Sequence, residues 1–235
     1  MRHFGVLIPS TNTTVEIEYG RLLPEDYQAH VGRLKSQGGT PFAPSIDAEI
    51  DYQARLLGTA RVEVVALAQT SASLFADDYD ATMVRRMREA AGVPALTSAE
   101  AVGQAIRALG ATRIAIASPY SPTVIGRAKH YYETKFGLDV LGLHSFDAAD
   151  AYMIGKLGPE HARDAFRRID RPEVEALLVP GGNFPTMRFV AEWEAAFGKP
   201  VITTNQAALW AMFRVMGVGE KLPGLGRLLA EMPPG

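Results

Sequence analysis

Hydroxyl and amide side chains gather at four points of the sequence, each directly after a short apolar run. They are Asn12 and the segments 69–71, 118–120 and 181–183. Loops of this kind present hydroxyls, amides and backbone N–H groups with no neighbouring cation. Such a surface suits a small carboxylate or a carbonyl oxygen that is becoming an oxyanion. If the preceding runs are parallel strands, the loops lie at the same edge of their sheets and converge on one site.

Each of these groups also has a purely structural interpretation. Residues 10–14 precede the acidic residues Glu16 and Glu18, and could simply cap a helix. Tyr120 could be a packing aromatic with a solvated hydroxyl, and Gly181 with its neighbour Gly182 could form a tight turn. The joint occurrence of the groups favours the chemical interpretation more than any one of them does alone.

Composition excludes several classes of function. The 235 residues are 47% hydrophobic, enough to bury one large core or two small ones, and a formal net charge of -2 gives no basic field for nucleic acid or an anionic membrane. No apolar stretch approaches the roughly 18 residues of a membrane span, and the first residues show no signal-peptide pattern, so we expect a cytoplasmic protein. Cysteine is absent, which excludes disulfides, thiolate metal sites and a thiol nucleophile.

His144 has the most suggestive position of the five histidines, because Asp147 and Asp150 follow it at intervals of three residues. The spacing fits no strong metal motif, so we expect a solvated loop there and no metal. The sequence contains no G-x-G-x-x-G, no phosphate-loop lysine, no H-E-x-x-H and no nucleophile elbow. We therefore expect no cofactor.

The four loops must be positioned by buried strands, and two apolar runs are of the right kind. Residues 62–68 and 174–179 are rich in Val and Leu and bounded by polar residues, which is typical of strands at the centre of a parallel sheet. Helical patterns alternate with the strands, which predicts a parallel α/β protein. The further strands are expected at 3–9, 27–34, 93–96, 112–118, 138–143 and 200–203.

This pattern occurs twice, which predicts two lobes of related design. The first lobe should comprise residues 1–111 with the returning segment 205–235, and the second residues 112–204. No Gly/Ser-rich or Pro-rich tether separates the halves, so the lobes should pack closely around a cleft. A polar loop at 36–44 has the length of a segment that often covers a site, and it could act as a lid.

Five segments are distinctive in their joint order and spacing: PSTNTTVEIE at 9–18, ALAQTSASLF at 66–75, SPYSP at 118–122, LLVPGGNFPT at 177–186 and PGLGRLL at 223–229. With them the chain resembles the maleate cis–trans isomerase and arylmalonate decarboxylase branch of the aspartate/glutamate racemase superfamily. The resemblance implies two pseudo-symmetric, flavodoxin-like lobes with parallel sheets, the active-site cleft between them, and a homodimer or larger assembly. It also implies positions that bind the substrate carboxylate or stabilise an enediolate-like oxyanion, namely Asn12, Thr70, Ser71, Tyr120 and Asn183.

The chain departs from these relatives at two positions. Racemases and isomerases of the superfamily resemble one another in carrying a cysteine on each of two facing loops, and the decarboxylases keep the second. Here Gln69 stands at the first position and Gly181 at the second. Chemistry that passes through a thiol is therefore excluded. Gln69 could orient a water molecule but is not a useful base, so Glu16, Tyr120 or His144 would have to supply the proton chemistry.

Three hypotheses remain open. In the first, the enzyme carries out a lyase or hydrolase step on a small carboxylate-bearing substrate, including a cyclic one of hydantoin type. In the second, it is a thiol-free isomerase or decarboxylase of maleate or arylmalonate type. In the third, it is a non-catalytic protein that binds a carboxylate. We expect Tyr120, Thr70, Ser71 and Glu16 to be catalytic, and the substrate to be bound by Ser10, Asn12, Gln69, Gly181, Gly182 and Asn183.

Overall fold

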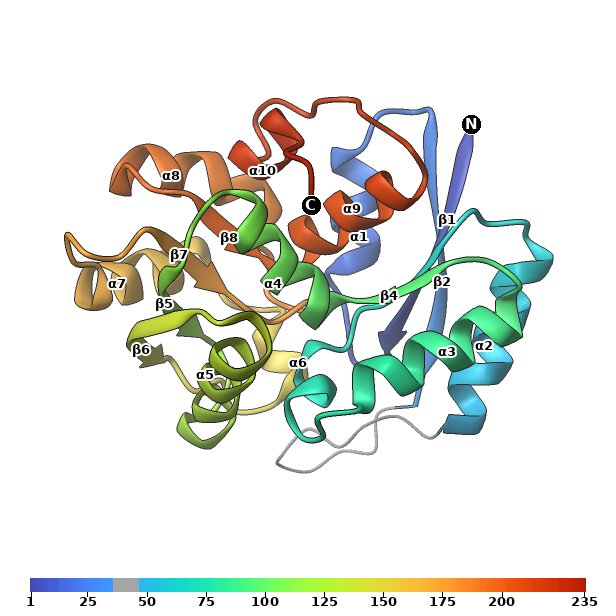
Figure 1. Ribbon diagram of the computed structural model, residues 1–235, viewed down its shortest axis with the longest axis horizontal. Coiled ribbons are helices and arrows are strands. Elements are labelled where there is room, and N and C mark those ends of the chain that lie inside the picture. The colour runs from blue at the N-terminus through green and yellow to red at the C-terminus, as the bar shows by residue number, and fades with distance from the viewer. Residues whose placement is uncertain (36–46) are drawn as a thin grey trace.

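Each half of the chain forms a four-stranded parallel sheet in the computed structural model, which describes residues 1–35 and 47–235 (Figure 1). The first sheet has the strand order β2-β1-β3-β4 and the second the order β6-β5-β7-β8. Because the second order repeats the first, the sheets are pseudo-symmetric, and both have the 2-1-3-4 start of a flavodoxin-like sheet. The predicted α/β fold is confirmed. The strands are β1 Arg2–Pro9, β2 Tyr27–Leu34, β3 Val65–Leu67, β4 Ala95–Thr97, β5 Arg113–Ser118, β6 Asp139–Ser145, β7 Ala176–Val179 and β8 Val201–Thr203.

Helices connect the strands in both halves. The predicted lid loop at 36–44 lies outside the described residues. No helix in the two described ranges has the length and apolar character needed to cross a bilayer. The α-helices are α1 Val15–Leu22, α2 Asp47–Thr59, α3 Tyr79–Ala91, α4 Ser98–Ala108, α5 Pro122–Phe136, α6 Ala151–Ile154, α7 Pro159–Ile169, α8 Val190–Phe197, α9 Thr204–Val215 and α10 Arg227–Glu231, and two short 3-10 turns are η1 Thr70–Leu74 and η2 Met187–Phe189.

The central strand of the first sheet is shorter than the apolar run that predicts it. β3 covers the last part of the predicted strand 62–68, although Val62 and Val64 are also buried. The length of β3 is limited by the residues that pair with it, which are 5–7 of β1 and 95–97 of β4. The chain therefore leaves the sheet just before Gln69, and the polar turn η1 begins at the carboxyl edge.

One hydrophobic cluster runs through both halves. It includes Phe4 and Ile8 from the first sheet, and Ile116 and Leu178 from the second. Helices α4 and α9 pack against each other where the halves meet (Figure 1). Because α9 also contacts β3 and β4 of the first sheet and β8 of the second, the lobe limits of 1–111 with 205–235 and of 112–204 stay a prediction.

Candidate active site

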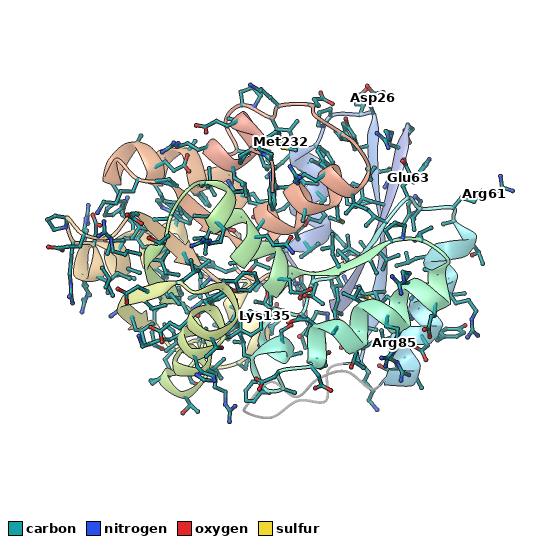
Figure 2. The ribbon with its side chains drawn as sticks, in the orientation of Figure 1. Asp26, Arg61, Glu63, Arg85, Lys135 and Met232 are labelled. Atoms are coloured by element: carbon teal, nitrogen blue, oxygen red, sulfur yellow. The ribbon has the colours of Figure 1, made fainter. Side chains whose placement is uncertain are left out.

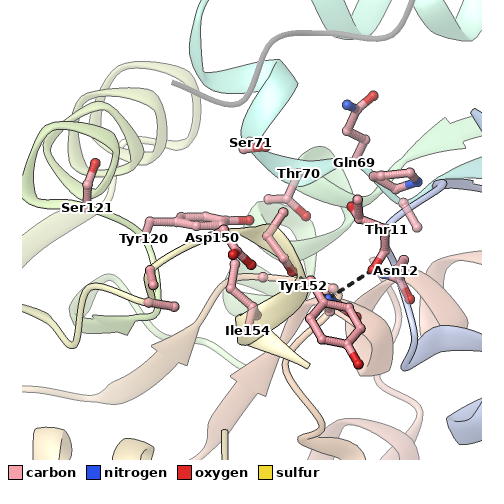
Figure 3. A pocket seen from close by; sticks show the side chains of 18 of the residues that line it. Thr11, Asn12, Gln69, Thr70, Ser71, Tyr120, Ser121, Asp150, Tyr152 and Ile154 are labelled. Carbon is pink, nitrogen blue, oxygen red and sulfur yellow. Dashed lines mark hydrogen bonds between the residues drawn. The ribbon is translucent and has the colours of Figure 1, made fainter. Parts of the chain in front are cut away.

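A cavity of about 560 Å³ opens where the carboxyl ends of the strands of both halves meet. Its walls come from the segments that follow β1, β3, β5, β6 and β7. Figure 3 shows Tyr120, Ser121 and Asp150 on one side of it, and Thr11, Asn12 and Gln69 on the other. A cavity of this size holds a small organic molecule, and the carboxyl ends of parallel strands are where open α/β sheets bind ligands.

Eight of the ten predicted site residues line this cavity: Asn12, Gln69, Thr70, Ser71, Tyr120, Gly181, Gly182 and Asn183. The other two lie elsewhere. Ser10 lines a separate surface groove with Arg33, and the half-exposed carboxylate of Glu16 forms an ion pair with the same arginine. The reason is the phase of α1, whose buried face carries Val15, Glu18 and Tyr19, so that Glu16 faces solvent.

The Thr70 hydroxyl is fixed by partners in both halves. Its Oγ1 lies 2.8 Å from Ser98 Oγ, and it donates to Thr204 Oγ1 at 3.4 Å. Thr204 Oγ1 also accepts the backbone N–H of Gly181 at 3.0 Å. A short chain of hydrogen bonds thus connects the turn after β3 with the loop after β7. The two loops that were expected to face each other are joined through the Thr204 side chain.

Tyr120 lies against the same turn, at Ser71, the residue after Thr70. Its side chain is 5% exposed, and its phenol is hydrogen-bonded to Ser71. Burial raises the pKa of Tyr120 above its ordinary value, and the hydrogen bond with Ser71 opposes that rise in part. Its backbone is held on both sides, because its N–H donates to Ser118 Oγ at 3.1 Å and its carbonyl accepts from Ser145 Oγ at 2.5 Å. Tyr120 is therefore a positioned, neutral hydrogen-bond donor rather than a base.

The two predicted asparagines differ in what their side chains have left to offer. Asn12 Oδ1 accepts the N–H groups of Thr14 and Val15 at 2.9 and 3.0 Å. This is the capping role that the sequence allowed, and it occupies the oxygen of the amide. Asn183 Oδ1 accepts the Thr13 N–H at 2.7 Å, and Asn183 Nδ2 donates to the Ala151 carbonyl at 2.7 Å. Asn183 thus holds three walls of the cavity together, and its role in binding substrate stays a prediction.

Gly181 makes room beside Tyr120. Its φ of +121° lies in a region that favours glycine, and a Cβ at this position would lie 3.1 Å from Pro119 Cγ and 3.7 Å from Tyr120 Oη. Gly182 is similarly close to its neighbours, with Asn205 Oδ1 3.1 Å from the place of a Cβ. A side chain at the position where relatives are expected to carry a cysteine would therefore be crowded against Pro119, and the glycine keeps that volume clear beside the Tyr120 phenol.

The charged side chains that line the cavity are Asp147 and Asp150, and the lining holds no Lys, Arg or His among the residues that the structure describes. Asp150 Oδ1 accepts the N–H of Met153 at 2.8 Å and so caps α6. His144 lies on β6, outside the cavity lining, and burial, followed by the charge of Arg168, lowers its pKa. Within residues 1–35 and 47–235, no cluster of His, Asp and Glu could hold a metal ion. The sequence had singled out both aspartates only as neighbours of His144.

Glu18 is a buried acid beneath the cavity that the sequence did not single out. Its Oε1 accepts the N–H groups of Thr186 and Met187 at 2.7 and 2.8 Å, and its Oε2 accepts from Asn205 Nδ2 at 2.6 Å. Burial raises the pKa of Glu18, and these hydrogen bonds oppose the rise. Asn205 Nδ2 also donates to the Gly182 carbonyl at 3.0 Å. Glu18, which lies on α1, therefore holds the loop after β7 in place through Asn205. The one signal in the sequence for its burial was its position three residues after the apolar Val15, which places both on one face of a helix.

Known proteins share both the sequence pattern and the fold. Residues 4–229 match the arylmalonate decarboxylase family. An arylmalonate decarboxylase from Bordetella bronchiseptica is 28% identical over 232 residues, which cover 97% of this chain and 96% of that protein. A maleate isomerase from Pseudomonas putida is 27% identical over 241 residues, 96% of each chain. A crystal structure of a Pseudomonas putida maleate isomerase with maleate matches with a TM-score of 0.90 at 26% identity, over 97% of both chains. The chain therefore belongs to the arylmalonate decarboxylase family.

Proposed function

We propose that the protein is an enzyme that carries out a cysteine-independent lyase or hydrolase step on a small carboxylate-bearing substrate. The observation that carries the proposal is the convergence of the hydroxyls of Thr70, Ser71 and Tyr120 on one cavity between the two halves. Family membership supports an enzyme, since the relatives are decarboxylases and isomerases. The absence of cysteine from the whole sequence separates the reaction from any that uses a thiol.

The hydroxyl cluster suits the stabilisation of negative charge on a substrate oxygen. Tyr120 keeps its proton because burial raises its pKa, and the hydrogen bond from Ser71 opposes that rise because the Ser71 O–H donates to the phenol oxygen. The Tyr120 O–H can then donate to an oxyanion. Preorganised donors of this kind typically contribute factors of about 10²–10³ each to turnover. In a lyase step, the electrons of the broken bond would move into the remaining carboxyl group as an enediolate. In a hydrolase step, water would add to the substrate carbonyl carbon and the carbonyl π electrons would rest on a tetrahedral oxyanion, whose collapse breaks the bond to the leaving group.

The proton must then come from a group other than a thiol. Glu16 and His144, which the sequence offered, lie outside the cavity lining. Gly181 and Tyr120 both line the cavity, and because Gly181 adds no side chain to it, the space beside them in the cavity can hold a water molecule or one edge of a ring. We propose that water in this space delivers the proton, and that Asp150 at the cavity wall exchanges protons with solvent.

A second candidate is a thiol-free decarboxylase or isomerase of arylmalonate or maleate type. It is favoured by the relatives, among them the maleate isomerase whose structure with maleate has the same fold. The third candidate, a carboxylate-binding protein without catalysis, would use the same cavity.

One experiment separates these candidates. The purified protein is incubated in heavy water with small dicarboxylates, arylmalonates and hydantoin-type rings, and product and deuterium are followed by NMR. The proposal expects conversion of a hydantoin-type ring, or of a dicarboxylate other than maleate or an arylmalonate, with no deuterium entering the unreacted substrate. Deuterium in unreacted substrate would instead indicate reversible proton transfer and favour an isomerase. A rise in Tm with a ligand, without turnover of any compound, would support the binding protein and overturn the proposal.

A further inference from the structure

Asp80 is a completely buried carboxylate that does not line the cavity. It lies on α3, and its two oxygens accept four hydrogen bonds. Oδ1 accepts from Ser73 Oγ at 2.7 Å and Thr97 Oγ1 at 2.6 Å, and Oδ2 accepts from Tyr131 Oη at 2.6 Å and Lys135 Nζ at 2.7 Å. Burying a carboxylate is costly unless such partners satisfy it. The donors come from three different elements, so Asp80 ties them to α3.

These partners belong to both halves of the molecule. Ser73 and Thr97 lie on η1 and at the end of β4 in the first half, whereas Tyr131 and Lys135 lie on α5 in the second. Figure 2 shows Lys135 where α5 faces the first half, and its Nζ also pairs with Glu100 Oε1 at 2.9 Å. Burial, and then the neighbouring carboxylate, raises the pKa of Tyr131, so its phenol remains a donor. Asp80 thus accepts hydrogen bonds from both halves and links them.

Through Ser73, these hydrogen bonds reach η1, the turn that carries the proposed catalytic hydroxyls. Ser73 lies two residues beyond Ser71 in the 3-10 turn η1. Helix α5 begins at Pro122, two residues after Tyr120, whose phenol is bonded to Ser71. The segment from Tyr120 through α5 therefore holds η1 at two places, once through Tyr120 at the cavity and once through Asp80 behind it.

We propose that Asp80 is a positioning residue, which sets the orientation of the Thr70 and Ser71 hydroxyls toward Tyr120 by holding Ser73 against α5. Asp80 does not touch the substrate. It acts through the turn, because a 3-10 turn of five residues has few internal hydrogen bonds to fix its own geometry. Misplacing a catalytic donor by about 1 Å can cost about 10²-fold in rate. The effect on turnover rests on the proposed function, whereas the effect on the turn does not.

The test compares two variants that each remove one donor to the same oxygen of Asp80. Ser73→Ala removes the hydrogen bond between Asp80 and the turn. Thr97→Val is the control, since it removes an equally buried donor that does not belong to η1. It also removes the cap that Thr97 Oγ1 gives the Glu100 N–H at 3.4 Å, so its effect is an upper limit for loss of the donor alone. Amide hydrogen–deuterium exchange of residues 70–75 is measured first, without any substrate. We expect exchange there to be at least tenfold faster in Ser73→Ala than in Thr97→Val.

Turnover is measured next, with the compound that the wild-type protein converts in heavy water. Ser73→Ala should lower kcat at least tenfold with KM changed less than threefold, because alignment matters most for the charged transition state. Thr97→Val should keep kcat within threefold. Tyr131→Phe should lower kcat as Ser73→Ala does, and the double variant should be no worse than the more affected single one, since both act through Asp80.

Equal exchange in Ser73→Ala and Thr97→Val would overturn the inference, and so would equal loss of kcat in the two. If no compound is converted by the wild type, the proposed function fails, but the exchange comparison still decides whether Asp80 positions the turn. Asp80→Asn is not required, so a folding defect of that variant leaves the test intact.

Discussion

Ser71 of the first half and Tyr120 of the second are hydrogen-bonded to each other at the cavity that both line. A second connection runs through Thr204, whose Oγ1 joins the Gly181 N–H to Thr70. Each proposed oxyanion donor is therefore held by a residue from the opposite half. The site depends on the packing of the two sheets against each other, and a change at that junction should affect turnover before it affects the fold.

Introducing a cysteine at Gly181 should be destabilising. Gly181→Cys combines a positive φ with a contact of 3.1 Å to Pro119 Cγ, and we expect a loss of at least about 1 kcal/mol in the free energy of unfolding. Gly198→Cys is the matched control, because Gly198 also has a positive φ, +68°, but nothing lies within 4 Å of its Cβ position. Urea unfolding measures both variants. Equal losses would show that the cavity tolerates a side chain there.

Asp150 should weaken the binding of dianions. Asp150→Asn keeps an oxygen for the cap of α6 and removes one of the two carboxylates of the cavity wall. We expect maleate to bind roughly two- to fivefold more tightly at low salt, with the gain shrinking as ionic strength rises. Calorimetric titration measures the affinity, and Asp164→Asn on the surface of α7 serves as the control. Unchanged affinity in Asp150→Asn would show that the carboxylate does not act on the ligand.

Stability should fall on acidification because of His30. Its ring lies 2.9 Å from His3 Nδ1, and burial, followed by the neighbouring His3, lowers its pKa below the ordinary value of 6.5. The unfolded chain then binds the proton more readily than the folded one, so this contribution is complete above about pH 6.5 and is lost as the pH falls below it. Urea unfolding between pH 5 and 8 should show a smaller pH dependence in His30→Gln than in the wild type. Parallel curves would contradict the assignment.

The sequence predicted those site residues that directly follow the end of a strand. Gln69, Thr70 and Ser71 follow an apolar run, and parallel topology alone brings such residues to one edge, as it does for Gly181. Glu16 was misplaced because a capping segment does not reveal which of two acids, Glu16 or Glu18, lies on the buried face of the following helix turn. The helix period settles this once the buried neighbours are known.

The supporting carboxylates could not be predicted. Asp80 occupies an acidic position in the first turn of a helix, as many solvated residues do, and its burial depends on α5 of the other half. The aspartates of the cavity wall follow the edge strand β6, in a loop whose path is set by contacts such as that of Asn183 with Ala151. These are contacts between segments distant in the sequence, and no local pattern encodes them.

The most direct measurement is the turnover of Tyr120→Phe beside that of Tyr132→Phe, on the compound that the wild type converts. Both variants remove one buried phenol oxygen, but Tyr132 Oη has no hydrogen-bond partner within the described part of the chain and does not line the cavity. If Tyr120 stabilises an oxyanion, Tyr120→Phe loses roughly 10²–10³ in kcat while its Tm stays close to that of the wild type, and Tyr132→Phe keeps wild-type turnover. Wild-type turnover in a folded Tyr120→Phe variant would contradict the account.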